Sequence, residues 1–422
     1  MSILSKKIIS NSLWMMLEKF IGIFGVVFVM SYVAKYIGPT NFGKIALATT
    51  LFTFVQTLTW FGNQEILFKR VSKNRELGLL YLSNTQNIRR ALFSLFSLPI
   101  LIVLYLCSDT LTFIYGVATA LASYFITQDI YTIYNNATLN SYVNAITNVA
   151  GLGIALIIRY IIIISQLDYA YLAVPIVLVA LIPYLLKKFI FNSKLSVQNL
   201  PTQRYHKYYL LAGSALVISS LAVSFYTQIT SLMLAAIAST HDLGIYAAAV
   251  MIGSSWSFIN FSIITSVMSK IYQEKDTFRS YIMVAKLNVM VVVISIGVVL
   301  FLILFGTWMV QLLYGSAYTA AYGLLIILAI STMMSGLGTI AARIMIKQGS
   351  YSYISKKMLC VAVSAFPISY FCIQEFGLKG AAYSVLIIEF LSLTFFNYFY
   401  KNGLIFKIHF FPFFKKSLKS QS

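Results

Sequence analysis

The chain alternates long apolar runs with short polar turns from one end to the other. A helix needs about 20 mainly apolar residues to cross the hydrocarbon core of a bilayer, and most of these runs reach that length. The third and sixth runs are shorter, and Pro367 interrupts the eleventh. The pattern predicts an all-α integral membrane protein with about twelve transmembrane helices. The runs lie at approximately 12–36, 43–66, 91–107, 111–135, 142–164, 170–186, 209–237, 243–268, 282–309, 320–346, 358–374 and 380–400.

Composition and charge placement agree with this pattern. The chain is 59% hydrophobic and only 10% charged, whereas a water-soluble surface needs far more charge. The net charge of +20 is distributed unevenly, because 25 of the 31 basic residues lie in segments on the N-terminal side of the membrane. The turns on the other side keep only Lys35, Lys44 and Lys379. By the positive-inside rule, both termini are expected to be cytoplasmic, and no nucleic-acid partner is expected.

The two halves of the chain share a weak internal sequence repeat. Residues 33–52 align with residues 234–253 at an offset of 201, which places Gly43 on Gly244 and Ala48 on Ala249. Parallel six-span repeats are typical of transporters built from two bundles. We therefore predict two six-helix lobes around a central cavity. The N-terminal lobe covers residues 1–186, a cytoplasmic linker covers 187–208, and the C-terminal lobe, which ends in a basic cytoplasmic tail, covers 209–422.

Polar side chains recur at helical spacing on one face of several spans. In the second span, for example, Thr49, Thr53, Gln56, Trp60 and Asn63 follow one another at intervals of four and three. Such a stripe either glues helices together or lines a hydrated cavity. The stripes of several spans in both halves favour the cavity. The lining candidates are Gln56, Trp60, Asn63, Tyr124, Gln128, Asn148 and Gln228.

A few charged residues lie within the apolar runs. One charge at a helix centre costs about 2.5–3.5 kcal/mol even on the mild insertion scale, so each must have a function or an ionic partner. Glu65 and Arg343 lie near inner ends, where a long side chain reaches the interface. The more deeply placed charges, for which a cavity or coupling role stands against a structural ion pair, are Glu18, Lys19, Asp129, Arg159 and Glu389.

Catalytic and cofactor motifs are not supported. Gly38 to Lys44 has the spacing of a nucleotide-binding loop, but Ile45 stands where the magnesium-binding hydroxyl should be. The three cysteines, Cys107, Cys360 and Cys372, show no paired spacing. We expect no catalytic residues, metal or cofactor.

The stretch Asn11-Ser-Leu-Trp14, Leu17-Glu18-Lys19 and Tyr32 to Gly43 resembles Wzx-type flippases. These are exporters of polysaccharide repeat units in the multidrug/oligosaccharidyl-lipid/polysaccharide superfamily. The likeness covers the whole chain as architecture, and its motifs are loose. It implies alternating access of two lobes that carry an undecaprenyl-diphosphate-linked oligosaccharide to the outer leaflet of a bacterial inner membrane, for O-antigen or capsule synthesis.

The resemblance also implies cavity cations that meet the diphosphate, and by position these are Lys19, Arg159 and Arg343. Glu18, Asp129 and Glu389 are candidates for coupling to H⁺ or Na⁺. Expected partners are the lipid-linked oligosaccharide, the bilayer and other polysaccharide assembly proteins. Two alternatives remain open at this point: a multidrug and toxin extrusion antiporter, and a membrane-embedded polysaccharide polymerase.

Overall fold

The chain folds into helices and short turns. In the computed structural model, residues 6–192 and 203–420 are described, and these contain no strand. The side chains of Lys19 and Glu65 lie outside the description. The helices are α1 (Lys6–Trp60), α2 (Asn63–Lys73), α3 (Arg75–Asn84), α4 (Gln86–Cys107), α5 (Thr110–Gln128), α6 (Ile130–Ala137), α7 (Ser141–Ile164), α8 (Ala173–Asn192), α9 (Gln203–Ile237), α10 (Thr240–Ser255), α11 (Ser257–Gln273), α12 (Thr277–Tyr314), α13 (Ala321–Lys347), α14 (Tyr351–Leu393), α15 (Phe395–Tyr398), α16 (Leu404–His409) and α17 (Phe411–Ser420), with 3₁₀ turns at Tyr169–Leu172 and Ser316–Tyr318.

Ten helical segments in the described part of the chain are long and apolar enough to span a membrane. Two of them are broken by a glycine in the left-handed region, Gly38 in α1 (φ 73°) and Gly377 in α14 (φ 53°). Each break divides one long segment into two passes, so the ten segments correspond to the twelve predicted spans. After the second break, a Cβ at Gly380 would collide with the carbonyl oxygen of Cys372. The predicted all-α membrane fold is confirmed.

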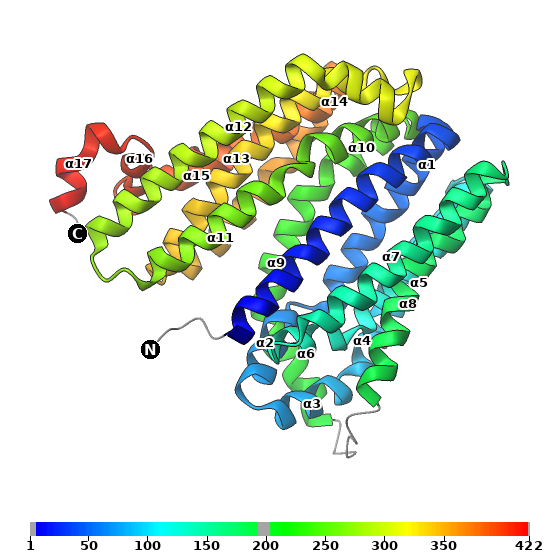
Figure 1. The fold of residues 1–422 in the computed structure, drawn as a ribbon, viewed down its shortest axis with the longest axis horizontal. Coiled ribbons are helices and arrows are strands. Elements are labelled where there is room, and N and C mark those ends of the chain that lie inside the picture. Colours follow the sequence, from blue (N-terminus) through cyan, green and yellow to red (C-terminus); the bar gives the residue numbers. More distant parts are fainter. Residues whose placement is uncertain (1–5, 193–202, 421–422) are drawn as a thin grey trace. The chain divides into compact units, whose positions relative to one another are not determined.

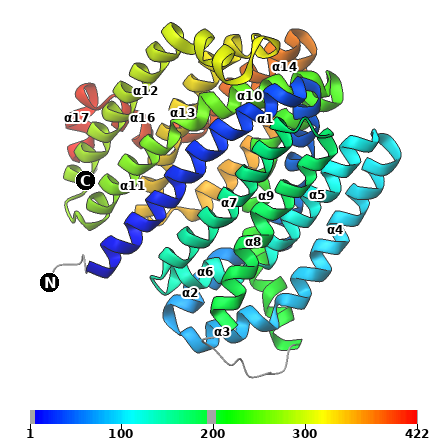
Figure 2. The same ribbon diagram turned by 45° about the vertical axis from the view of Figure 1, so that its right-hand side comes forward.

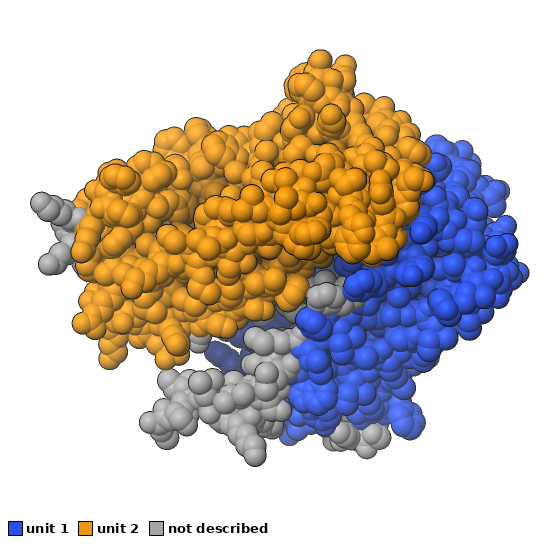
Figure 3. Space-filling model, turned by 45° about the horizontal axis from the view of Figure 1, so that its top comes forward, with its two compact units in different colours: residues 1–224 blue, residues 225–422 orange. Residues whose placement is uncertain are grey.

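The chain forms two compact units, residues 1–224 and residues 225–422, which are coloured separately in Figure 3. In the first unit, α1 packs against α4, α5 and α7, and α8 packs against α5 and α7 (Figures 1 and 2). In the second unit, α13 packs against α10, α11, α12 and α14. The predicted lobe boundaries, with a linker at 187–208, stay a prediction, and residues 193–202 of that linker lie outside the described part.

Three predicted outer turns of the first unit are bonded to one another. Lys44 in the first turn forms an ion pair of 2.7 Å with Asp109 in the second. The hydroxyl of Tyr36 donates to the carbonyl oxygen of Leu167 in the third turn at 2.8 Å. Partial burial alone would raise the pKa of Asp109, but hydrogen bonds from Lys44 and Thr112 outweigh it and lower the pKa below its ordinary value. The turns that the sequence predicts for one face of the membrane therefore do share one end of this unit.

The C-terminal segment folds back onto the second unit. α16 and α17 both pack against α12. Leu404, Ile405 and Leu418 from this segment are buried in the same core cluster as residues of α12 and α13. The predicted basic tail is therefore largely helical and docked.

The outward faces of the long helices remain apolar. On α12, for example, Val289, Val293, Leu304 and Trp308 are more than half exposed. No water-soluble surface would tolerate such a stripe, but a lipid-facing surface requires one. Exposure of these side chains is what the composition predicts for a polytopic membrane protein.

One predicted span boundary differs from the structure. The second pass ends at Trp60, because Phe61 and Gly62 both adopt positive φ angles of 48° and 72°. Asn63, which the sequence pattern assigns to the inward face of that pass, is instead the first residue of α2. The connection at 67–90 is helical over most of its length, as α2, α3 and the start of α4.

Candidate functional site

A buried lysine on α8 organises a polar network inside the first unit. The Lys187 side chain is only 2% exposed. Its ammonium donates to Asp129 Oδ2 at 2.8 Å, to Thr132 Oγ1 at 2.8 Å and to Asn148 Oδ1 at 2.7 Å. An ammonium has three N–H donors, and all three are used. The lysine therefore joins the α5–α6 junction, α6 and α7 to α8.

A break in the helix between α5 and α6 positions the Asp129 side chain beside Lys187. Asp129 lies between α5 and α6 with non-helical angles of φ −76° and ψ 75°. Its carboxylate accepts a hydrogen bond of 3.1 Å from the backbone N–H of Thr132, which caps α6. The other oxygen, Oδ2, accepts from the Thr132 hydroxyl at 2.8 Å and from the Lys187 ammonium. The backbone break and the buried ion pair depend on each other.

The network extends across α7 to the first helix. Asn148 uses its carbonyl oxygen for Lys187 and its amide nitrogen for the Glu18 carboxylate of α1. Three residues that the sequence singles out as charged or polar candidates, Glu18, Asp129 and Asn148, are therefore brought together. The sequence analysis did not select the residue that unites them, Lys187, because a lysine near a span end resembles an interfacial cation.

An amide cluster continues the network at the same end of α7. Asn135 donates to Asn144 Oδ1 at 2.8 Å, and Asn144 donates to Asn136 Oδ1 at 2.9 Å. Ser141 donates to the same Asn136 oxygen at 2.7 Å. Buried amides that bond one another are costly to expose to lipid, so this cluster fixes α6 against α7.

The predicted lining residues at and just after the C-terminal end of α1 have structural partners. Asn63 is fully buried, donates to the carbonyl oxygen of Tyr209 at 3.1 Å and accepts from the Tyr81 hydroxyl at 3.0 Å. Trp60 is buried, and the Arg89 guanidinium lies 5.5 Å from its ring. The Tyr209 hydroxyl donates to the Thr59 carbonyl oxygen at 2.9 Å. These contacts tie α1 to α9.

Of the other predicted site residues in this unit, two have side-chain contacts with neighbouring helices, and two have no hydrogen-bond partner among the described residues. Gln56 donates to Ser123 Oγ at 2.9 Å, and the Tyr124 ring packs against Phe93. Gln128 is buried, and neither of its amide atoms has a hydrogen-bond partner in the part of the chain that the structure describes. Arg159 on α7 is buried as well, and within the described residues no hydrogen bond or ion pair holds it.

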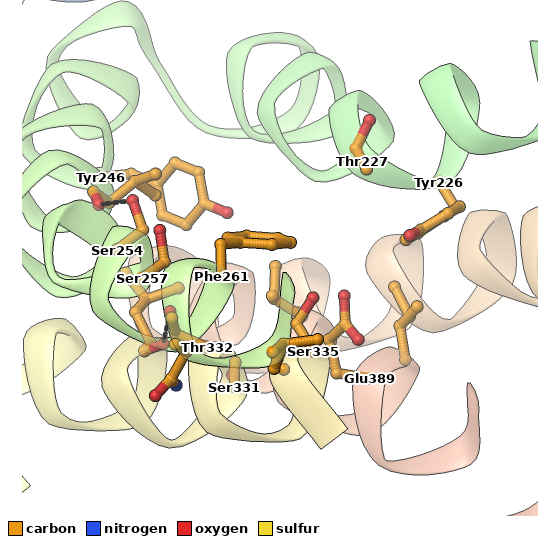
Figure 4. A pocket seen from close by; sticks show the side chains of 17 residues that line it. Tyr226, Thr227, Tyr246, Ser254, Ser257, Phe261, Ser331, Thr332, Ser335 and Glu389 are labelled. Carbon is orange, nitrogen blue, oxygen red and sulfur yellow. Dashed lines mark hydrogen bonds between the residues drawn. The ribbon is translucent and has the colours of Figure 1, made fainter. Parts of the chain in front are cut away.

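A cavity of about 300 Å³ lies inside the second unit, between α9, α10, α11, α13 and α14. Glu389 of α14 faces it beside Ser335, and hydroxyl-bearing side chains lie among apolar ones along the rest of a mostly apolar wall (Figure 4). Asn260 also lines it, and the Asn260 Oδ1 atom is buried without a hydrogen-bond partner among the described residues. The hydroxyl-bearing lining residues are Tyr226, Thr227, Tyr246, Ser254, Ser257, Ser331, Thr332 and Ser335.

Glu389 is the predicted site residue that this cavity contains. Lys357, which is also buried, interacts with the Glu389 carboxylate electrostatically. Arg343 lines no part of this cavity and donates to Thr265 Oγ1 at 3.2 Å, and Gln228 is half-buried on α9 outside the lining set. The serines and threonines of the wall were missed by the sequence analysis, although their spacing of three and four along spans eight and ten was available as a signal.

In the described part of the chain, metal-ligating side chains do not gather at either of these two sites. No group of three or more His, Cys, Asp or Glu side chains comes together within the described residues. The first unit offers an ionic network and, in Arg159, a buried arginine without a partner among the described residues. The second unit offers a cavity whose mostly apolar wall carries hydroxyl groups and one carboxylate. Such polar interiors inside apolar helices are typical of proteins that carry polar solutes across bilayers.

Comparison with solved structures shows the class of fold. The chain is similar to lipid II flippase MurJ in an inward closed conformation, with a TM-score of 0.72 and 16% identity over 95% of this chain and 90% of that one. It is also similar to an outward-facing multidrug resistance MATE transporter, with a TM-score of 0.63 and 12% identity over 99% and 97% of the two chains. A third match is a MOP superfamily transporter from Pyrococcus furiosus, with a TM-score of 0.60 and 12% identity over 96% of each chain. The fold is that of the MOP transporters.

The family is shown by the sequence itself. The family model described as "Polysaccharide biosynthesis protein" matches residues 8–269, which is more than half of the chain. The chain therefore belongs to the polysaccharide biosynthesis protein family, and the resemblance to polysaccharide exporters of this superfamily is confirmed. No curated protein matches the sequence.

Proposed function

We propose that this protein is a flippase for undecaprenyl-diphosphate-linked oligosaccharides, which it moves from the cytoplasmic to the outer leaflet of a bacterial inner membrane. One observation carries the proposal: a chain of the polysaccharide biosynthesis family has the fold of MOP transporters along its whole length. Membrane steps of polysaccharide synthesis include passage of a lipid-linked sugar across the bilayer, and a transporter fold suits that step. The product would supply O-antigen, lipopolysaccharide or capsule assembly.

The physical task favours a two-lobed protein. The polyprenyl tail can stay in lipid, whereas each polar group of the sugar and diphosphate that crosses without a partner costs several kcal/mol, about 2–7 for a neutral group. Two six-helix lobes, residues 1–186 and 209–422, would rock around a central cavity and supply those partners. Lys19, Arg159 and Arg343 are the proposed diphosphate contacts. Among them, a buried Arg159 without a described partner is the side chain with most to gain from an anion.

Coupling to an ion is the second part of the proposal. Outward movement of an anionic headgroup is favoured by about 2.3 kcal/mol per charge per 100 mV when the inside is negative, so an ion gradient is an additional drive. Glu389 is the best-placed coupling residue because it faces a cavity, whereas Glu18 and Asp129 are engaged by Asn148 and Lys187. A flipping rate that is unchanged by a pH or Na⁺ gradient, in the parent protein and in Glu389→Gln alike, would exclude this role.

A multidrug antiporter is the second candidate, and the structural similarity to MATE transporters supports it. A deletion strain separates the two. The flippase proposal expects lipid-linked oligosaccharide to accumulate, inaccessible to a lectin added to spheroplasts, and surface polysaccharide to be lost. A strain that keeps its surface polysaccharide and becomes sensitive to cationic drugs would support the antiporter instead. Unchanged flipping with loss of polymer length would support the polymerase alternative.

A further inference from the structure

The connection between the second and third passes forms a helical hairpin at the inner end of the first unit. α2 and α3 pack through Leu67, Val71 and Leu79, which are all buried. A Cβ at Gly78 would lie 2.7 Å from the Cα of Val71, so only glycine allows this close approach. The hairpin therefore has a fixed position directly beside the ends of two spans.

The hairpin is strongly basic. Residues 69–90 contain six basic side chains and a single acid, Glu76. Lys69, Lys73 and Arg75 are exposed, as is Arg90 at the start of α4. Because the segment joins two predicted spans, we expect these charges to lie near the depth of the lipid headgroups.

Two of the exposed cations in this region rest on one row of aromatic rings. The Arg75 guanidinium lies 5.3 Å from the Tyr134 ring centre, and the Lys188 ammonium lies 5.9 Å from that of Tyr184. The rings between them touch in sequence: Tyr134 to Phe191 at 5.2 Å, Phe191 to Tyr131 at 4.9 Å, and Tyr131 to Tyr184 at 6.0 Å. We name this set the cation–ring ladder; it consists of Arg75, Tyr134, Phe191, Tyr131, Tyr184 and Lys188.

The rings of the ladder restrict the side-chain conformations of Arg75 and Lys188, but they provide no negative charge to pair with them. A cation on an aromatic face gains about 0.5–1 kcal/mol at an exposed site, and the ring offers no hydrogen-bond acceptor in the plane of the guanidinium. The Arg75 and Lys188 N–H donors therefore remain available to an external anion. Phosphate is the anion whose geometry suits a planar guanidinium fork.

The surroundings indicate a lipid as the source of that phosphate. Phe189, next to Lys188, is 77% exposed, and Phe68, next to Lys69, is 43% exposed. An exposed ring beside each cation offers a contact for the glycerol and upper acyl carbons, which a free phosphate lacks. Clusters of four to eight basic residues beside a span attract anionic leaflets by about 1 kcal/mol per charge.

We propose that the cation–ring ladder and the basic hairpin bind the headgroups of anionic phospholipids in the leaflet at this end of the protein. Arg75 and Lys188 hold the phosphate, and Phe68 and Phe189 rest in the upper part of the leaflet. The site anchors the inner end of the first unit to the membrane surface. It is independent of the transported substrate.

Native mass spectrometry of the full-length protein, with phosphatidylglycerol and phosphatidylcholine in equal amounts, tests the proposal. The double variant Arg75→Gln, Lys188→Gln is expected to lose preference for phosphatidylglycerol by about fivefold for each charge removed. Arg75→Lys is expected to lose less of the preference for phosphatidylglycerol than the double variant does, because it keeps the positive charge and removes only the planar guanidinium fork. The matched control is Lys275→Gln, Lys356→Gln, which removes two exposed cations from the second unit.

Equal losses in the test and control variants would overturn the proposal, since net charge alone would then explain binding. Undecaprenyl diphosphate is added as a competitor in a separate series. If it displaced phosphatidylglycerol one for one in the parent protein, and Arg75→Gln, Lys188→Gln abolished its binding, the ladder would belong to the substrate and the phospholipid proposal would be wrong. No transport is measured, so failure here leaves the flippase proposal untouched.

Discussion

The Lys187 ammonium lies 2.8 Å from the Asp129 carboxylate at the break between α5 and α6. Both side chains are largely buried, and Asn148 connects the lysine to Glu18 of α1. A buried ion pair often contributes little compared with an apolar pair, but removing one partner leaves an uncompensated charge. The pair joins α8 to the α5–α6 junction. Loss of either member alone would leave a buried charge without a partner and would therefore destabilise this contact.

Lys187→Met is expected to lower the free energy of unfolding by about 3–5 kcal/mol. The double variant Lys187→Met, Asp129→Asn is expected to recover much of that loss, because no buried charge is left without a partner. Thermal unfolding of the purified proteins measures both. Lys188→Met, an exposed neighbour, is the control. A double variant no more stable than Lys187→Met would contradict a coupled pair.

Asn63 is expected to act in folding. Asn63→Ala removes the hydrogen bonds to Tyr209 and Tyr81 and leaves buried partners unsatisfied, at a cost of about 1–3 kcal/mol. Thermal unfolding should register the loss, and flipping per folded molecule should stay near the parent value. Gly213→Ala, whose Cβ would collide with the carbonyl oxygen of Phe61, should show the same pattern. If Asn63→Ala kept normal stability but lost flipping, the folding role would be wrong, and Asn63 would instead act in the transport cavity.

His409 should make stability depend on pH. Burial lowers the pKa of His409 to about 4 from its ordinary 6.5, and its ring bonds the Tyr398 hydroxyl at 3.1 Å. The unfolded chain binds this proton near pH 6.5 and the folded chain only near pH 4. Stability is therefore complete above pH 6.5 and falls progressively towards pH 4, by at most about 3 kcal/mol.

The slope of unfolding midpoints between pH 7.5 and pH 4.5 measures this effect. His409→Asn should flatten the slope, because its amide cannot titrate, whereas His241→Asn, at an exposed position, should leave it unchanged. Identical slopes in His409→Asn and the parent would show that another group carries the dependence.

The sequence predicted the fold more completely than the site. Apolar run lengths and basic turns are local properties, and they predicted the twelve passes and the break between the runs at 12–36 and 43–66. The polar stripes identified Asn148, because a side chain on the inward face of a helix is visible from spacing alone, and the rarity of charges within apolar runs identified Glu18 and Asp129. Lys187 was missed because its burial depends on the break at Asp129 lying opposite α8, which is a tertiary relationship. Asn63 was assigned to a cavity because the polar stripe was continued past Gly62, although a glycine at such a position commonly ends a helix.

Arg159 is the most informative position for substrate contact. We expect Arg159→Gln to lower flipping roughly tenfold or more, since a hydrogen bond to a charged group contributes about 1.5–3 kcal/mol. Stability should not fall, because within the described residues Arg159 has no partner to lose. Surface polysaccharide at matched protein level reports the effect in cells. Arg279→Gln, an exposed arginine paired with Asp276, is the control. Full activity of Arg159→Gln would remove this residue from the substrate path.

The central claim is that the protein moves a lipid-linked oligosaccharide between leaflets, and reconstitution tests it directly. The purified chain is placed in liposomes that contain undecaprenyl-diphosphate oligosaccharide with a fluorescent sugar, and an impermeant quencher is added outside. We predict that quenching proceeds beyond the outer-leaflet fraction, and does so more slowly with Arg159→Gln than with Arg279→Gln. Quenching that stops at the outer-leaflet fraction, as in protein-free liposomes, would contradict the claim.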